Sequence, residues 1–291
     1  MSLLVVAVVG PTAAGKSELG VALARALGGE VVNADSMQLY RGMDIGTAKL
    51  SLEERQGIPH HLLDVWDVRV TATAAVYQEL ARGVVADSAV PLVFVGGSGL
   101  YLRAALDRLE FPGTDPELRA LLEAELEEHG PLPLWERLRS LDPEAATRME
   151  PTNGRRIVRA LEVVILTGSM PGEMTSYEAF VPTTYIGIDR PDLRERVAER
   201  VERMWAAGLV DEVTGLDGLR EGVTASRALG YAQALAQLDG SMTESEAKVA
   251  TVSATNRFVK RQRAWFGRDP RIHWLDPDRD LLAQALRVIG S

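Results

Sequence analysis

A phosphate-binding signature near the start of the chain most constrains what this sequence can fold into. An apolar run at 3–9 precedes the signature, and a helical pattern at 16–27 follows it. The signature, G-x-x-x-x-G-K-[ST], is therefore met in the strand–loop–helix context that it requires. We call it the phosphate loop; its residues are Gly10, Pro11, Thr12, Ala13, Ala14, Gly15, Lys16 and Ser17.

The chemistry of such a loop is anion binding. Glycines let the backbone turn so that its N–H groups point inward, and the following helix directs its positive dipole end to the same place. Lys16 is expected to hold terminal phosphate oxygens, and the Ser17 hydroxyl to ligate Mg²⁺. The loop predicts a diphosphate or phosphoanhydride ligand, but by itself it leaves open whether that ligand is a nucleotide.

The order of the remaining segments predicts an α/β fold. Short apolar strands are expected at 30–33, 90–95, 183–189 and 272–275, separated by helical patterns. We therefore predict a P-loop NTPase-like parallel sheet flanked by helices, formed by residues 1–113 and 183–291. Residues 114–182 carry no strand signal and are predicted to be an all-helical insertion that ends in a loop over 172–182.

Composition excludes several kinds of chemistry. The 291 residues include no cysteine and only four histidines, which argues against disulfides, thiol nucleophiles and zinc sites. His60 and His61 are adjacent, so on a strand they point to opposite faces, and we expect them to be hydrogen-bonded structural residues. The apolar start has no basic leader, and no apolar run is long enough to span a membrane. We expect a cytoplasmic protein with no membrane partner.

Asp35 directly follows the second predicted strand, which we expect to lie beside the strand that carries the phosphate loop. Ligands of open α/β sheets bind at the carboxyl ends of strands. Three roles for Asp35 stay open from its position: a ligand of magnesium or water, a general base, and the cap of a short helix.

A second glycine loop, residues 96–101, follows the strand at 90–95 and precedes another helix. We expect it to face the same crevice as the phosphate loop. Ser98 in this loop could hydrogen-bond a diphosphate, cap the helix, or do both.

Two arginine clusters are candidates for phosphate contact. Arg155, Arg156 and Arg159 lie within five residues that contain no acid, which favours contact with phosphate over surface pairing of Arg159 with Glu162. The helix that begins at Pro191 also carries several arginines. We expect one of them to meet a leaving diphosphate, and we expect Arg200 and Arg203 to form exposed pairs with neighbouring glutamates.

The helix predicted over 243–266 becomes strongly basic towards its end, although the net charge of the whole chain is −9. Trp265 and Phe266 lie among the cations, and aromatic residues among cations suit a nucleic acid with unstacked bases. A solvated cationic face is the alternative, and the acidity of the rest of the chain favours RNA contact. The cations are Arg257, Lys260, Arg261 and Arg263.

Taken together, these segments resemble the bacterial tRNA dimethylallyltransferase family, also called tRNA isopentenyltransferases. The resemblance spans nearly the whole chain, and the segments at 34–40 and 44–49 are its most specific part. The matching segments are GPTAAGKS at 10–17, ADSMQLY at 34–40, DIGTAK at 44–49, HHLLD at 60–64, GGSGLY at 96–101, RALE at 159–162, KRQ at 260–262 and WF at 265–266.

The resemblance implies a reaction: transfer of a dimethylallyl group from its diphosphate to the exocyclic amine of the adenosine just 3′ of a tRNA anticodon. It implies Asp35 as general base, Ser98 at the meeting point of base and diphosphate, and Mg²⁺ as cofactor. Arg196 is our choice for the diphosphate cation, and we expect a monomer with the insertion clamping the anticodon stem-loop. The residues expected to bind tRNA are Asp35, Ser36, Met37, Gln38, Arg155, Arg156, Ile157, Val158, Arg159, Arg257, Lys260, Arg261 and Arg263.

Three positions depart from the family's pattern, and one alternative function stays open. Ser17 and Ser98 each stand where threonine is common, so the hydroxyl is kept. Gly154 replaces an aspartate, which puts any contact of that aspartate in doubt. The alternative is a small-molecule kinase that uses ATP–magnesium on the same phosphate loop.

Overall fold

A computed structural model describes residues 3–171 and 176–290 of the chain. The chain divides into two compact units, one formed by Met1–Arg108 with Glu178–Ser291 and the other by Leu109–Tyr177. The predicted insertion, 114–182, is shifted towards the C-terminus relative to the second unit. Residues 172–175 of the predicted loop lie outside the described residues.

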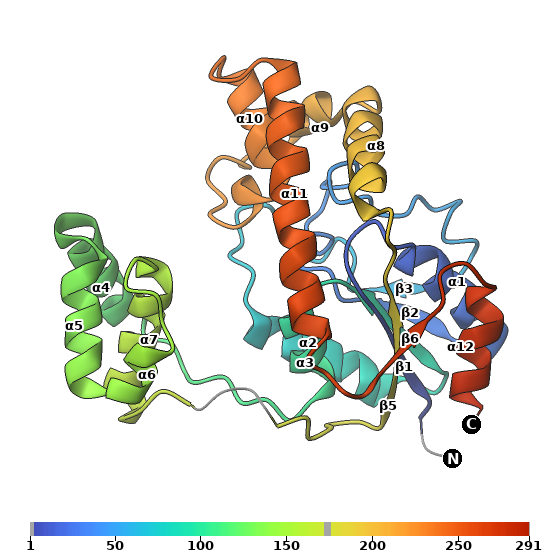
Figure 1. Ribbon diagram of the computed structural model, residues 1–291, viewed down its shortest axis with the longest axis horizontal. Helices are drawn as coiled ribbons and strands as arrows, with labels where there is room; N and C mark the ends of the chain where they lie inside the picture. The colour runs from blue at the N-terminus through green and yellow to red at the C-terminus, as the bar shows by residue number, and fades with distance from the viewer. Residues whose placement is uncertain (1–2, 172–175, 291) are drawn as a thin grey trace. The chain divides into compact units, whose positions relative to one another are not determined.

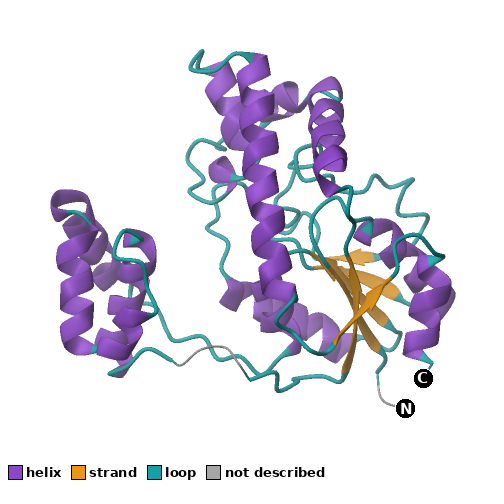
Figure 2. Ribbon diagram, viewed as in Figure 1, coloured by secondary structure: helices purple, strands orange, loops and turns teal. Residues whose placement is uncertain are grey.

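The first unit is built on a parallel sheet, whose strands are orange in Figure 2. The strand order is β3–β2–β4–β1–β5–β6. β4 lies between β1 and β2, so the expectation that the strand before Asp35 is next to the phosphate-loop strand is wrong. The crossover through the first helix carries the chain past one strand position, which β4 later fills. The strands are β1 (Val5–Val9), β2 (Glu30–Asn33), β3 (His60–His61), β4 (Leu92–Gly96), β5 (Thr183–Ile188) and β6 (Ile272–Leu275).

Helices cover both faces of this sheet (Figure 1). Successive residues of a strand point to opposite faces, and β1 supplies Val5, Ala7 and Val9 to one core and Val6 and Val8 to the other. The first core also contains α2 (Ala74–Asp87) and α3 (Gly99–Leu106). The second contains α1 (Lys16–Leu27) and α12 (Leu281–Ile289). Burial on both faces explains why the strands read as continuous apolar runs.

The parallel arrangement places several loops at one edge of the sheet. Val9 pairs with Gly96, and Asn33 pairs with Val95, so β1, β2 and β4 end almost level with one another. The phosphate loop, Asp35 and Ser98 follow these three strand ends. Strands that run the same way and end in register therefore bring together residues from distant parts of the sequence.

A group of helices is added to the sheet between β5 and β6. The long helix α11 packs along α8, and α10 packs on α11 and α9 (Figure 1). A 3₁₀ turn and the helix α10 lie on either side of Gly230, whose φ of 88° is incompatible with one continuous helix. The elements are α8 (Leu193–Ala206), α9 (Leu209–Gly215), the 3₁₀ turn η1 (Ala225–Arg227), α10 (Tyr231–Leu238) and α11 (Glu244–Phe266).

The described residues of the second unit form four helices around an apolar core of their own. They are α4 (Pro116–His129), α5 (Pro131–Leu141), α6 (Pro143–Thr147) and α7 (Gly154–Thr167). Proline in the first turn of α4, α5 and α6 suits helix starts, where no N–H partner is lost. At Gly154 a Cβ would lie 2.5 Å from the Leu126 side chain, so glycine makes room for this contact where the family pattern has aspartate.

Within the described part of the chain, no helix combines the length and the apolar character needed to cross a membrane.

The core of the second unit gives a first prediction. Leu138 and Leu132 both lie on α5, but Leu138 is fully buried and Leu132 is 54% exposed. Leu138→Ala should destabilise this unit by about 2–5 kcal/mol through lost apolar contacts and a cavity, whereas Leu132→Ala should change stability by no more than about 0.5 kcal/mol. Hydrogen–deuterium exchange of peptides from α4 to α7 in the full chain measures both. Equal protection in the two variants would contradict this core.

Candidate functional site

The phosphate loop begins with a close approach between two backbones. Gly10 has a φ of +139°, and a Cβ there would lie 2.1 Å from the carbonyl oxygen of Ile188 on the neighbouring strand β5. Gly15 precedes α1 in the left-handed region, and no side chain caps the N-terminus of that helix. The first N–H groups of α1 are thus left for an anion rather than for a side-chain cap.

Lys16 folds back over the loop. Its ammonium group donates to the carbonyl oxygen of Pro11 at 2.7 Å. Burial lowers the pKa of Lys16 to about 8, the charge of Asp35 opposes this shift, and the charge of Arg200 adds to it. A bound anion would stabilise the charged form of Lys16, so the electrostatics of the loop favour anion binding.

Two arginines lie against the loop from the segment that follows β5. Arg190 Nε donates to the carbonyl oxygen of Ala14 at 3.1 Å, and Arg196 Nε donates to that of Ala13 at 2.8 Å. Arg196, our predicted diphosphate cation, therefore lies directly against the phosphate loop. These contacts occupy one nitrogen of each guanidinium, which carries further N–H donors for a ligand.

Arg200 does not form the exposed pair with a glutamate that the sequence predicted, so that prediction is wrong. Its Nη1 donates to Thr12 Oγ1 at 3.1 Å and its Nη2 to the carbonyl oxygen of Thr47 at 3.1 Å. Burial lowers the pKa of Arg200, and Asp35 counteracts that shift. The sequence of α8 could have indicated this position for Arg200. Arg196 and Arg200 are one turn apart, and each is next in sequence to a buried valine, Val197 or Val201.

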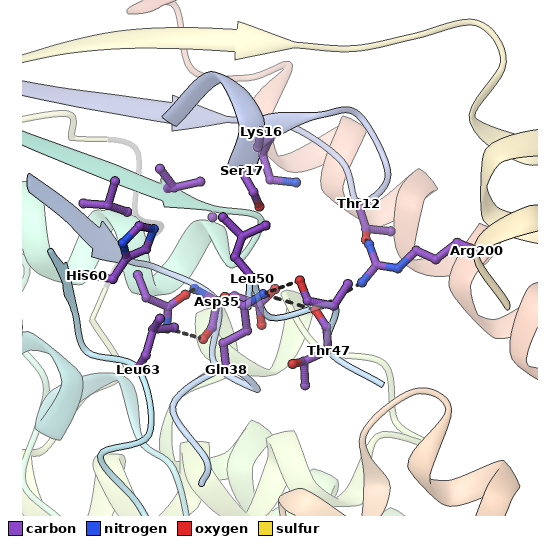
Figure 3. A pocket seen from close by; sticks show the side chains of 15 residues that line it. Thr12, Lys16, Ser17, Asp35, Gln38, Thr47, Leu50, His60, Leu63 and Arg200 are labelled. Atoms are coloured by element: carbon purple, nitrogen blue, oxygen red, sulfur yellow. Dashed lines mark hydrogen bonds between the residues drawn. The ribbon is translucent and has the colours of Figure 1, made fainter. Parts of the chain in front are cut away.

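The residues of the site surround a small central pocket (Figure 3). Lys16 and Ser17 from the start of α1 lie on one side of it, Asp35 lies on another, and Arg200 reaches towards Thr12 and Thr47. The pocket brings together the carboxylate and the phosphate loop even though their strands are not neighbours. Its lining residues are Thr12, Lys16, Ser17, Val31, Asn33, Asp35, Gln38, Thr47, Ala48, Leu50, His60, Leu63, Val95, Gly96 and Arg200.

Two larger cavities adjoin the same residues. The cationic cavity, about 720 Å³, is lined by Lys16, Ser17 and Arg196 among others, and its six Lys and Arg side chains outnumber its four carboxylates. The apolar cavity, about 320 Å³, is lined by Asp35 and Ser98 together with apolar side chains of α8 and α11. Arg200 lines both cavities and the central pocket. The site therefore has a side suited to an anion and a side suited to a flat apolar group, with Arg200 common to both.

Asp35 lines the central pocket and the apolar cavity and has one of its two carboxylate oxygens engaged. Its Oδ1 accepts the N–H of Met37 at 2.9 Å, which is the capping role left open by the sequence. Asn33 fixes the backbone of Asp35 by accepting its N–H at 2.9 Å and donating to its carbonyl oxygen at 3.0 Å. Among the described residues no group hydrogen-bonds Oδ2 of Asp35. The carboxylate can therefore cap the turn and still act on a ligand.

Ser98 lies opposite the same turn. Its hydroxyl accepts the N–H of Ser36 at 3.3 Å and donates to the Ser36 hydroxyl at 3.4 Å. It precedes α3 without making a side-chain cap bond to that helix. Ser36 and Met37 line the apolar cavity together with Ser98, and Gln38 lines the central pocket. All four side chains thus gather around Asp35.

The segment at 44–49 is held by two carboxylate clusters that sequence reasoning did not foresee. Glu212 on α9 accepts the N–H groups at 44–46, the shortest at 2.7 Å, and the Tyr231 hydroxyl at 2.5 Å. Lys49 pairs with Asp44 and Asp64 at 2.6 Å each. These contacts fix the loop whose Thr47 carbonyl receives Arg200. No local sequence pattern links positions this far apart.

The basic residues of α11 divide into two sets. Arg263 forms a bidentate ion pair with Asp189, at 2.9–3.1 Å, and also donates to the Arg190 carbonyl oxygen. Its guanidinium therefore stabilises the folded structure. Lys260 and Arg261 are exposed. Phe266 is 4% exposed and belongs to the core, so it cannot stack on a base as the sequence pattern suggested.

The arginine run of the second unit divides in the same way. Arg155 and Arg156 are exposed at the start of α7. Ile157 and Val158 are buried in the core, so the expectation that their side chains contact RNA is corrected. Arg159 pairs with Glu162 at 2.5 Å and donates to two backbone carbonyl oxygens, the alternative weighed from the sequence.

The donor atoms of the site suit a magnesium ion carried by a ligand. The part of the chain that the structure describes holds no group of three or more His, Asp or Glu side chains that could bind a metal by themselves. His60 contacts the Ile58 carbonyl oxygen and His61 contacts Glu30. Ser17 supplies an oxygen next to the phosphate loop, and Mg²⁺ is commonly held by few protein oxygens together with substrate phosphates.

Comparison with known proteins gives consistent matches. The family model described as IPP transferase matches residues 38–269. The "tRNA dimethylallyltransferase" of Streptomyces coelicolor is 63% identical to this chain, over 93% of this chain and 89% of the relative. The protein of the same name from Parafrankia is 60% identical, over 99% of this chain and 93% of the relative. The crystal structure of a tRNA isopentenylpyrophosphate transferase from Bacillus halodurans has a TM-score of 0.70, with 37% identity over 99% of this chain and 94% of that chain.

The low pKa of Lys16 gives a prediction for anion binding. Above pH 8 the free protein loses the Lys16 ammonium charge, so its affinity for inorganic pyrophosphate should fall, approaching about tenfold per pH unit. Lys16→Arg keeps its charge and supplies the control for ionisation of pyrophosphate itself. Calorimetric titration between pH 7 and pH 10 measures the ratio of the two affinities. A ratio that does not change with pH would remove Lys16 from anion binding.

Proposed function

This chain belongs to the IPP transferase family, and we propose that it transfers a dimethylallyl group from dimethylallyl diphosphate to tRNA. The acceptor is the exocyclic amine of the adenosine 3′-adjacent to the anticodon, and diphosphate is released. The observation that carries this proposal is the placement of Arg200 in the lining of both the cationic and the apolar cavity, with Asp35 lining the apolar cavity and the central pocket beside the phosphate loop.

The phosphate loop holds the diphosphate of the donor. Its N–H groups and the Lys16 ammonium contact the phosphate oxygens, and Arg196 and Arg200 approach from α8. Cations already in place at the departing oxygens stabilise the charge that develops as the carbon–oxygen bond breaks. Arg200 joins Arg196 as a diphosphate cation in this proposal, because it lines the cationic cavity and the central pocket.

Magnesium completes the diphosphate site in this proposal. Ser17 would hold it together with diphosphate oxygens, as the oxygen donors on this side of the site allow. When bound, the ion supplies charge neutralisation to the leaving group.

The adenine enters from the apolar cavity. An adenosine must leave its stack to reach a recessed site, as in other enzymes that modify bases. Its amine nitrogen attacks the first carbon of the dimethylallyl group, the bond from that carbon to the diphosphate oxygen breaks, and the amine proton passes to Oδ2 of Asp35. Ser36, Met37, Gln38 and Ser98 surround the entering base.

The RNA backbone meets exposed cations. In the first unit the contacting residues are Arg257, Lys260 and Arg261 on α11, and in the second unit they are Arg155 and Arg156. We propose that the second unit clamps the anticodon stem-loop. A local basic surface is what a phosphate backbone meets, so a net charge of −9 is compatible with RNA binding. We also propose that the protein is a monomer and that it acts in the cytoplasm.

Product analysis separates this function from an ATP-dependent kinase. The protein is incubated with Mg²⁺ and unmodified tRNA, together with either dimethylallyl diphosphate or ATP, and the nucleosides are then analysed by mass. The proposal predicts adenosine with an added five-carbon group and released diphosphate in the first arm only. Release of ADP with a phosphorylated acceptor would establish the kinase instead.

Asp35→Asn should lower kcat by about a hundredfold or more, because it removes the proton acceptor of the transfer step. Asparagine keeps an oxygen for the N–H of Met37, so the turn and the binding of tRNA should persist. Single-turnover kinetics and a tRNA filter-binding assay measure the two effects separately. Unchanged turnover would exclude Asp35 as general base.

The double change Lys260→Ala with Arg261→Ala should weaken tRNA binding and reduce the slope of log affinity against log salt by about one to two. The matched control is Lys248→Ala on the same helix, because Lys248 is already paired with Glu202 and Glu244 at 2.9 and 2.7 Å. Binding is measured from 50 to 300 mM salt. If both proteins show the wild-type slope, the RNA surface lies elsewhere.

A further inference from the structure

Gln262 is a buried amide that joins two loops of the site. It lies on α11 directly after Arg261, and its side chain is turned into the protein with 4% exposure. Its Oε1 accepts the N–H of Thr12 at 2.9 Å, and its Nε2 donates to the carbonyl oxygen of Gly97 at 2.9 Å. One side chain thereby bridges the phosphate loop and the second glycine loop.

The neighbours of these two contacts are functional groups. Thr12 also receives the guanidinium of Arg200 through its hydroxyl, and Gly97 directly precedes Ser98. A shift of the Gln262 amide would therefore change the position of Arg200 and Ser98 relative to each other. A glutamine suits this task because one planar amide carries both a donor and an acceptor.

A side chain at position 97 would displace the Gln262 amide from its present position. A Cβ on Gly97 would lie 2.3 Å from Gln262 Nε2, closer than side-chain atoms approach each other. Gly97 has an ordinary backbone conformation, so this contact with Gln262, rather than φ, is what requires glycine. Glycine at position 97 therefore lets the Gln262 amide approach closely enough to donate to the Gly97 carbonyl oxygen.

We propose that Gln262 is a positioning residue that sets the spacing between the phosphate loop and the Ser98 loop, and so aligns the leaving diphosphate with the acceptor amine. The inference rests on the proposed function for the identity of the reaction. It extends that function by joining α11, the helix with the exposed cations Lys260 and Arg261, to the diphosphate site through hydrogen bonds. Gln262 itself touches neither substrate.

The test compares Gln262→Ala with a matched core variant of the same helix. Gln262→Ala leaves the N–H of Thr12 and the carbonyl of Gly97 without partners, so pyrophosphate affinity should fall by about tenfold or more, and kcat should also fall. The KM for tRNA should stay within about twofold, because no exposed cation is changed. Val259→Ala removes only buried methyl groups of α11 and should lower the melting temperature without changing either affinity or kcat.

Two further variants keep the test decisive if Gln262→Ala does not fold. Gln262→Glu keeps an acceptor for Thr12 but cannot donate to Gly97 when ionised, and it should reproduce the loss. Gly97→Ala displaces the amide from the opposite side and should reproduce it as well. Because alanine at 262 removes the clash, the combined Gly97→Ala/Gln262→Ala variant should lose no more than either single variant.

Pyrophosphate binding is measured by calorimetry and does not depend on prenyl transfer, so a failure of the proposed function and a failure of this inference are distinguishable. The inference is overturned if Gln262→Glu and Gly97→Ala bind pyrophosphate and turn over as Val259→Ala does. It is also overturned if the effects of Gly97→Ala and Gln262→Ala multiply in the combined variant.

Discussion

The parallel direction of the strands is the constraint on which the rest of this structure depends. β1, β2 and β4 end almost level with one another, and the loop after each strand contains residues of the candidate site. The phosphate loop, Asp35 and Ser98 come together only because their strands point the same way. Loops at this edge can vary while the sheet beneath is fixed by two apolar cores, which is why such an edge suits a binding site.

Charge at the site is unbalanced in a way that calls for an anion. Lys16, Arg196 and Arg200 surround the phosphate loop, and Asp35 is the carboxylate whose charge favours both Lys16 and Arg200. Burial lowers the pKa of each of these two cations, which indicates that their charges are incompletely compensated. A bound diphosphate would compensate them, as the proposed function requires.

The sequence predicted the α/β class and the phosphate loop, because each depends on local patterns. It predicted the gathering of Asp35 and Ser98 from the rule that parallel strands end at one edge of a sheet. It did not predict that β4 separates β1 from β2, since strand order depends on crossovers that no local pattern encodes. Arg200 was assigned to the surface because glutamates lie nearby in sequence, whereas in space it faces Thr12 and Thr47. The sequence does place Ile157 on the inner face of an amphipathic helix, and the structure buries Val158 beside it in the same core.

The central claim is that a prenyl diphosphate on the phosphate loop and an unstacked adenine meet at Asp35. A crystal structure with a non-reactive thio-diphosphate analogue of the donor, Mg²⁺ and an anticodon stem-loop RNA tests it most directly. The account predicts the diphosphate at Lys16 and Ser17, and the adenine amine within hydrogen-bond reach of Oδ2 of Asp35. An adenine bound away from Asp35, or a diphosphate bound outside the phosphate loop, would contradict it.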